Sequence, residues 1–149
     1  MTHKIPVSVL VVVHTSALEV LLLERATRSG YWQSVTGSLD REDEPLEGAA
    51  ARELLEETGI DPARGRLTRL DVANTFEIFR QWRHRYAPGV QYNTEHVFAF
   101  ELPARQPVRI AQDEHVAFAW LPWREAVEKC FSWSNRDAIR ILCERPVIS

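Results

Sequence analysis

The segment Val7–Val13 constrains the fold more than any other stretch, because it is almost entirely apolar and rich in β-branched valine. A basic residue, Lys4, precedes it, so the N-terminus has two readings, a signal peptide or a buried strand. A signal peptide usually has an apolar core of about 7–15 residues, so this run is at the low end. β-branched side chains favour strands. We therefore expect a buried strand over Val7–His14.

The rest of the chain predicts further strands, separated by a few helices. The expected strands are Val20–Arg25, Trp32–Thr36 (closed by Gly37), Leu67–Asn74, Phe76–Phe79, Glu95–Leu102 and Val116–Leu121. Pro62–Arg66 is expected to be a loop. The expected helices are Leu46–Thr58 (stopped by Gly59), Pro122–Cys130, and Asn135–Cys143 (capped by Ser134 or Asn135). A chain of 149 residues suits one domain, so we expect a single α/β domain over residues 1–149 with a mixed sheet.

Composition excludes several classes of partner. The formal net charge is -3, so no broad basic field is available to bind a nucleic acid. No apolar stretch approaches the ~18 residues that a membrane-spanning helix needs. Cys130 and Cys143 have no metal-binding spacing and are interpreted as buried thiols. We expect a cytoplasmic protein with a small-molecule partner, no nucleic acid and no membrane. The oligomeric state stays open.

The helix Leu46–Thr58 carries three acidic residues, Glu53, Glu56 and Glu57, at positions i, i+3 and i+4. This spacing places side chains next to one another, so the three carboxylates are expected to converge. At about 100° per residue, Glu53 and Glu57 also fall within the arc of the apolar residues Ala50 and Leu54. An unpaired charge near a core is costly. Something positive is therefore expected beside these glutamates.

Two interpretations of the acidic helix remain open from these residues alone. One is a solvated helix whose glutamates pair with Arg52 and other cations. The other is a hard-ligand site, because several carboxylates without a nearby histidine or cysteine suit Mg2+ or Mn2+ and not zinc.

The flanks of the helix resemble the Nudix box, G-x5-E-x7-R-E-U-x-E-E-x-G-U, in which U is aliphatic. The matching residues are Gly37, Glu44, Arg52-Glu53-Leu54, Glu56-Glu57 and Gly59-Ile60. Six residues instead of five separate Gly37 from Glu44, so either Asp43 or Glu44 fills the place of the first glutamate. An added residue in a turn costs little closure entropy. The resemblance implies a Nudix fold, in which a mixed β-sheet is sandwiched between α-helices (α/β/α).

The resemblance also implies a divalent-metal hydrolase that cuts a phosphoanhydride bond. Glu53 and Glu57 would be the principal ligands of Mg2+, for which Mn2+ is a possible substitute, and Glu56 would be a further ligand, acting through water. Arg52 would orient and partly neutralise the glutamates. A carboxylate in a loop, Glu114, would add a metal ligand or a base.

A narrower resemblance is to the family of bacterial dihydroneopterin triphosphate pyrophosphatases of folate synthesis. It rests on Trp32–Ser38, Phe76–Phe79, Arg83–Val90, Asn93–Glu95, Glu114–His115 and Ser132–Arg136. It implies a reaction that releases pyrophosphate from dihydroneopterin triphosphate and leaves the monophosphate. The substrate-binding residues that it implies are Lys4, Arg25, Thr36, Phe76, Glu77, Ile78, Phe79 and Ser132.

Some of these implied roles have a plain physical basis, and some have a structural alternative. Lys4 and Arg25 can bind phosphate, and Phe76 or Phe79 can stack on a flat heterocycle. The phenylalanines could also be core residues, and Glu114 could lie in a solvated turn. The basic segment Arg83–Arg85 is either a solvated loop or the rim of a substrate site. For His84, His96 and His115 we expect structural roles, because they lack helical metal-ligand spacing.

Two other functions are compatible with the same box. One is a Nudix pyrophosphohydrolase that removes nucleoside or deoxynucleoside triphosphates. The other is a non-catalytic Nudix module that binds a ligand, although such modules usually lose the box glutamates that this chain retains.

Overall fold

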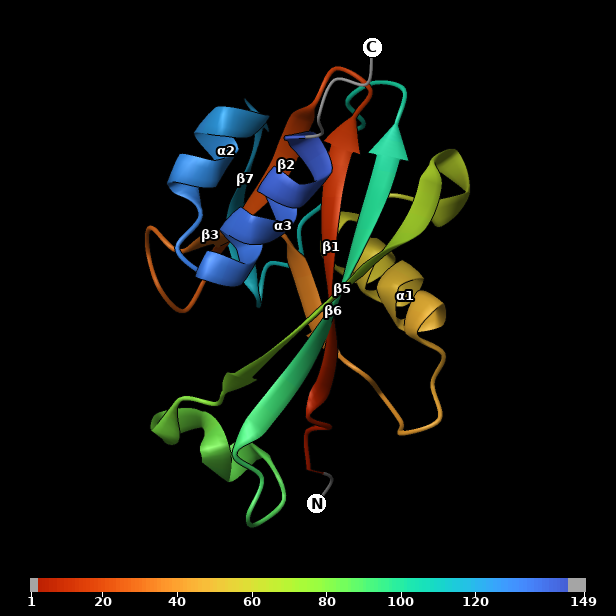
Figure 1. The fold of residues 1–149 in the computed structure, drawn as a ribbon. Coiled ribbons are helices and arrows are strands. Elements are labelled where there is room, and N and C mark those ends of the chain that lie inside the picture. The colour runs from red at the N-terminus through yellow and green to blue at the C-terminus, as the bar shows by residue number, and fades with distance from the viewer. Residues whose placement is uncertain (1–2, 145–149) are drawn as a thin grey trace.

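The computed structural model describes residues 3–144 and shows a mixed, seven-stranded sheet with helices on both sides (Figure 1). The elements follow in the order β1 (Val7–Thr15), β2 (Glu19–Arg25), β3 (Trp32–Gln33), β4 (Val35–Ser38), α1 (Leu46–Thr58), η1 (Pro62–Arg64), β5 (Arg66–Glu77), η2 (Arg80–Arg85), β6 (Tyr92–Leu102), β7 (His115–Pro122), α2 (Trp123–Lys129) and α3 (Trp133–Cys143).

Strand β1 is the centre of the sheet. All of Val7–Thr15 pairs in parallel with β6. The other edge of β1 pairs antiparallel with β4 over residues 8–11 and with β2 at His14. Residues 9–13 are 0% exposed, so both faces of the strand are buried. This explains the continuous apolar run, since a strand that is covered on both sides needs no polar alternation.

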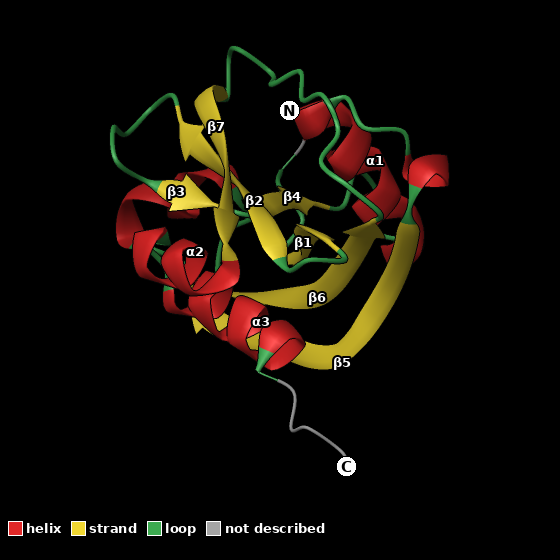
Figure 2. Cartoon of the chain, turned by 90° about the horizontal axis from the view of Figure 1, so that it is seen from above, coloured by secondary structure: helices red, strands yellow, loops and turns green. Residues whose placement is uncertain are grey.

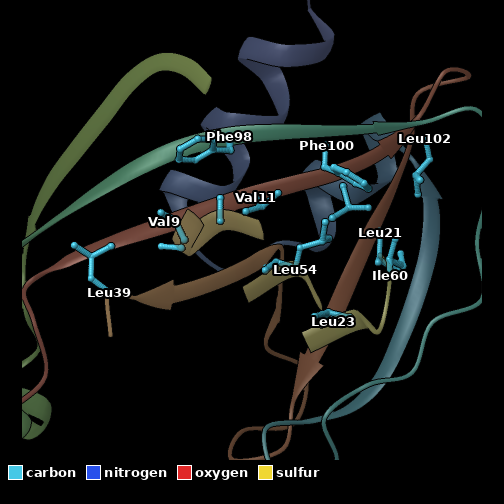
Figure 3. Close-up of a cluster of buried hydrophobic side chains, with 14 residues drawn as sticks. Val9, Val11, Leu21, Leu23, Leu39, Leu54, Ile60, Phe98, Phe100 and Leu102 are labelled. Atoms are coloured by element: carbon cyan, nitrogen blue, oxygen red, sulfur yellow. The ribbon is translucent and has the colours of Figure 1, made fainter. Parts of the chain in front are cut away.

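Alternate side chains of β1 enter two separate cores. Val9 and Val11 pack with Leu54 of α1 in the first core, which Figure 3 shows in close-up. Leu10 and Val12 pack in the second core with residues of α2 and α3. Figure 2 shows α1 on one side of the sheet and α2 with α3 on the other. The predicted mixed sheet between helices is confirmed.

Helix α1 has the bounds predicted from the sequence. Pro45 precedes its first residue, where proline is tolerated, and Gly59 ends it in the left-handed conformation, with φ of 71°. The buried side of the helix includes Glu53 and Glu57 beside its apolar residues. The predicted inward orientation of these two glutamates is therefore confirmed.

The strand predicted over Trp32–Thr36 is instead two strands, β3 and β4. The backbone N–H of Ser34 leaves the sheet and donates to Oδ1 of Asn135 at 2.7 Å. The two halves then pair with different partners, β3 with β2 and β4 with β1. Gly37 does not close the strand, because it lies within β4.

Several further predicted boundaries are wrong. Strand β6 begins at Tyr92 and not at Glu95, and the predicted loop Pro62–Arg66 contains η1 and the first residue of β5. The strands expected at Leu67–Asn74 and Phe76–Phe79 form one strand, β5, because its pairing with β6 resumes beyond a bulge and continues to Glu77. Helix α3 begins earlier than predicted, and its cap is Ser132, whose side chain accepts from the N–H of Asn135.

No helix within residues 3–144 is both long and apolar enough to cross a membrane. The N-terminal apolar run is the central strand of the sheet, as expected. Cys130 is buried and Cys143 is half-buried. The cytoplasmic location stays a prediction.

Candidate functional site

Two glutamates of α1 lie against strand β4 in the interior of the protein. Glu53 is 9% exposed and Glu57 is 1% exposed. Gly37 of β4 permits this packing, because a Cβ at that position would lie 2.1 Å from Cδ of Glu53. The glycine is therefore required by the close approach of a carboxylate to the strand, where any larger residue would collide with it.

The electrostatics of this pair are unfavourable without a cation. Burial and the nearby Glu53 and Glu114 carboxylates raise the pKa of Glu57 well above its usual value, although the N–H of Thr36 opposes the shift. Burial also raises the pKa of Glu53, against the effect of the Arg52 guanidinium. Oε2 of Glu57 has no hydrogen-bond partner. A buried carboxylate oxygen with no donor marks a place where positive charge would be strongly stabilised.

Glu114 and His115 complete a cluster of possible metal ligands around Glu57. Glu114 directly precedes β7, and one ligand atom from each of the three residues lies within 4.8 Å of the others. Nε2 of His115 is 3.6 Å from Oε1 of Glu57. Burial and Arg25 lower the pKa of His115 to about 4, so its ring is neutral and can offer a lone pair. The donor set fits a divalent cation.

The cluster lies in a cleft of ≈ 750 Å³ that adjoins a second cleft of ≈ 830 Å³. We call the cleft of ≈ 750 Å³ the acidic cleft and the cleft of ≈ 830 Å³ the aromatic cleft. The acidic cleft contains Glu53, Glu57 and Glu114. The residues that line both clefts are Lys4, Arg25, Gln33, Thr36, Gly37 and Ser38. The two cavities therefore form one continuous site with cationic residues at the junction.

The structure brings together every substrate-binding residue that the sequence predicted. All of them line the aromatic cleft: Lys4, Arg25, Thr36, Phe76, Glu77, Ile78, Phe79 and Ser132. Phe79 follows β5, is 57% exposed and meets the Trp82 ring edge-on, with 5.3 Å between centroids. On another part of the wall, the rings of Tyr31 and Phe131 stack 4.1 Å apart.

Glu56 departs from the prediction that the three carboxylates of α1 converge. Its side chain is 56% exposed, and it pairs with the Arg52 guanidinium at 3.3 Å instead of entering the cluster. Ser132 has a structural task besides lining the cleft, because its hydroxyl accepts from Nδ2 of Asn135 at 2.6 Å.

His115 was expected to have a structural role, and no role was predicted for Asn93 or Glu95. The structure places His115 in the cluster of possible metal ligands around Glu57, and it places the other two residues on the wall of the aromatic cleft. A pattern that could have found them is strand alternation, because Asn93 and Glu95 stand in phase with the buried residues Val97 and Ala99.

Comparison with known families supports this geometry, since the NUDIX domain family matches residues 4–141. The chain belongs to the Nudix family. It is 46% identical over 140 residues to the dihydroneopterin triphosphate diphosphatase of Escherichia coli K12, covering 92% of this chain and 91% of that protein. It is 35% identical over 143 residues to the Haemophilus influenzae protein of the same name, covering 94% and 89%.

Solved structures of Nudix proteins share the fold. The E. coli dihydroneopterin triphosphate pyrophosphohydrolase superposes with a TM-score of 0.85 at 42% identity, covering 95% of this chain and 97% of that one. A NUDIX hydrolase of Listeria monocytogenes superposes with a TM-score of 0.79 at 23% identity, covering 95% and 94%, and shows the fold alone.

The geometry also decides the register of the Nudix box. Nε and Nη2 of Arg52 donate to the two carboxylate oxygens of Glu44, at 2.9 and 3.1 Å. Nη1 of Arg52 donates to Glu53 at 2.8 Å. Asp43 instead pairs with Arg41 at the surface. Glu44 therefore fills the position of the first box glutamate, and the added residue is absorbed in the turn before α1.

Proposed function

We propose that this chain, acting as a single Nudix domain, hydrolyses dihydroneopterin triphosphate to the monophosphate and pyrophosphate with Mg2+. The observation that carries the proposal is the junction of the acidic cleft and the aromatic cleft through Lys4, Arg25 and Thr36. This arrangement suits a small molecule with a charged triphosphate at one end and a flat ring at the other. The two bacterial relatives bear the name of this activity.

The acidic cleft would hold Mg2+ through Glu57 and Glu114, with Glu53 and His115 beside them, because the unpartnered Oε2 of Glu57 offers an unused ligand. The cation, when bound, neutralises phosphate charge and lowers the pKa of the attacking water. Arg52 holds Glu53 in place by a charge-assisted hydrogen bond and is itself fixed by Glu44. The protein thus supplies a preformed carboxylate site.

The junction supplies the groups that bind phosphate. The pKa of Lys4 is lowered by burial and by the neighbouring Arg85 and Arg25, which shows that the cations gather there. Arg25 also lies over the Trp82 ring, at 5.8 Å from its centroid. Negative phosphate oxygens would relieve the repulsion among these cations while the glutamates hold the metal ion.

The aromatic cleft supplies the surface for the ring of the substrate. The exposed face of Phe79 and the stacked pair Tyr31 and Phe131 offer apolar planes of the right shape. A planar bicyclic ring can stack on such planes while its polar edge meets the wall of the cleft.

A turnover assay tests the proposal. The purified protein is given dihydroneopterin triphosphate and, in parallel, each common nucleoside and deoxynucleoside triphosphate, and pyrophosphate is measured with Mg2+ or with EDTA. We expect the highest kcat/KM for the pterin substrate and no turnover in EDTA. Higher kcat/KM for an ordinary nucleoside triphosphate would favour a nucleotide-removing enzyme, and no turnover of any substrate would favour a binding module.

A further inference from the structure

Two polar residues of β6 lie buried where the second core meets the aromatic cleft. Asn93 is 5% exposed and Glu95 is 6% exposed. They point to the same face as Val97 and Ala99, which belong to the second core. Both also line the aromatic cleft. The inner row of β6 thus changes from apolar to polar where the cleft begins.

Each of these side chains has an acceptor without a donor. Oε1 of Glu95 and Oδ1 of Asn93 are buried and make no hydrogen bond. The other end of the Asn93 amide is occupied, because Nδ2 donates to the hydroxyl of Ser8 at 2.8 Å. A buried polar atom without a partner costs about 1–3 kcal/mol. Two such acceptors on one cleft wall therefore favour a ligand that brings donors.

The Ser134 hydroxyl is the one donor that affects the Glu95 carboxylate, and Oε1 of Glu95 stays without a partner. Burial raises the pKa of Glu95 to about 7, opposed only by the Ser134 hydroxyl, and no cation contributes to the shift. Phe76 lies directly opposite Asn93 in the β5–β6 ladder. The acceptor of Asn93 therefore lies beside an aromatic residue, and that of Glu95 lies where no cation affects the carboxylate.

We propose that Glu95 and Asn93 determine specificity by accepting hydrogen bonds from the ring N–H and the amino group of a 2-amino-4-oxopyrimidine edge. This inference rests on the proposed function, and it names the feature of the substrate that the aromatic cleft recognises. Pterins and guanine share this edge. Adenine presents an acceptor at the corresponding ring nitrogen, so it would face the carboxylate without a donor at that atom.

The first test is binding of neopterin, which is fluorescent and lacks phosphate, to the whole chain without metal. We expect Glu95→Gln to weaken this binding roughly 10- to 100-fold, because the lost hydrogen bond to a charged acceptor is worth about 1.5–3 kcal/mol. Glu101→Gln is the matched control, since Glu101 is an exposed residue of the same strand, and it should leave binding unchanged. Unchanged neopterin binding in Glu95→Gln, or no binding by the wild-type chain, overturns the inference.

The second test separates pterin and guanine recognition from general ring binding. GTP and ATP are measured as competitive inhibitors of dihydroneopterin triphosphate turnover, in the wild-type chain and in Glu95→Gln. We expect GTP to bind more tightly than ATP in the wild-type chain and to lose this advantage in the variant. An equal loss for both nucleotides would show that Glu95 does not read the donor edge.

These outcomes distinguish the two proposals. If the chain has no turnover but binds neopterin in a way that depends on Glu95, the proposed hydrolase activity is refuted and the proposed ring recognition is supported. If the chain has normal turnover and Glu95→Gln leaves it unchanged, the hydrolase activity is supported and the role of Glu95 in ring recognition is refuted. If the glutamine variant fails to fold in a melting experiment, Glu95→Asp keeps the charge, withdraws its oxygens by one methylene and should show the same weakening of neopterin binding.

Discussion

Replacing Gly37 with alanine tests whether the placement of Glu53 governs the metal site. The new Cβ would lie 2.1 Å from Cδ of Glu53 and 2.3 Å from its Oε1, whereas ordinary contact begins at 3.4 Å. The carboxylate must therefore move by more than an ångström. It cannot do so without disturbing the 2.8 Å bond from Arg52.

The size of the effect follows from two separate terms. Overpacking by one methyl group costs about 1–3 kcal/mol of unfolding free energy in a filled interior, and the half-buried Gly37 should fall at the low end of that range. Misplacement of a catalytic group by about 1 Å costs about 100-fold in rate. We therefore expect Gly37→Ala to remain folded, with a modestly lowered melting temperature, and to lose about 100-fold or more in kcat at saturating Mg2+.

The assay is pyrophosphate release from dihydroneopterin triphosphate across a Mg2+ titration, alongside urea denaturation without metal. Gly48→Ala is the control, because Gly48 lies in α1, the helix that carries Glu53, and its added Cβ would meet nothing closer than 3.9 Å. This control should gain about 0.5–1 kcal/mol in stability and keep its turnover. Wild-type kcat and Mg2+ dependence in Gly37→Ala would refute the assigned role of Glu53.

Three further perturbations follow from the same structure. Glu57→Gln should fold normally, lose roughly 100-fold or more in turnover and no longer gain thermal stability from Mg2+, as checked by melting curves in a Mg2+ titration. Arg52→Ala should lower the unfolding free energy in urea by about 1.5–3 kcal/mol, because Glu44 and Glu53 lose their partner; wild-type stability would contradict this. Since burial raises the pKa of Glu95 to about 7, its stabilising contribution is full below about pH 4.5 and falls as the pH rises through 7. Between pH 5 and pH 8, the unfolding free energy of the wild-type chain should therefore fall by roughly 2–3 kcal/mol relative to that of Glu95→Gln, as measured by urea denaturation without metal. If the two chains show the same pH dependence, the pKa of Glu95 is not raised.

Helix α1 could be predicted to its end residues because its determinants are local. Pro45, the run of helix-forming residues and Gly59 act within a few positions of one another. Strand β1 was equally predictable, because residues 9–13 are all apolar, which is typical of a strand that is buried on both faces. Local chemistry decided these elements.

The break between β3 and β4 could not be predicted in this way. Ser34 leaves the sheet because Asn135, 101 positions away, accepts its N–H. The same asparagine is held by Ser132, which also caps α3 in place of the predicted Ser134 or Asn135. The first error comes from a contact between distant segments, which leaves no local trace in the chain, whereas the cap by Ser132 is a local hydrogen bond to Asn135.

The candidate metal site was predictable only in part. Helical geometry placed Glu53 and Glu57 toward the core, but spacing alone also admitted Glu56, which points to solvent beside Arg52. Glu114 was named through family resemblance, and His115, for which a structural role was predicted, lies in the same cluster of possible ligands. Both reach Glu57 because β7 pairs with β2, a pairing between segments about ninety residues apart that periodicity does not reveal.

The break at Ser34 lies where the two clefts on opposite sides of the sheet adjoin. Glu53 and Glu57 face the first core, on the α1 side, whereas Asn93 and Glu95 extend the second core, on the α3 side. Four of the six residues shared by the two clefts flank the break, with Gln33 before it and residues 36–38 after it. A continuous strand at this position would separate the acidic cleft from the aromatic cleft. We infer that the interrupted strand lets a triphosphate bound on one face present its ring to the other.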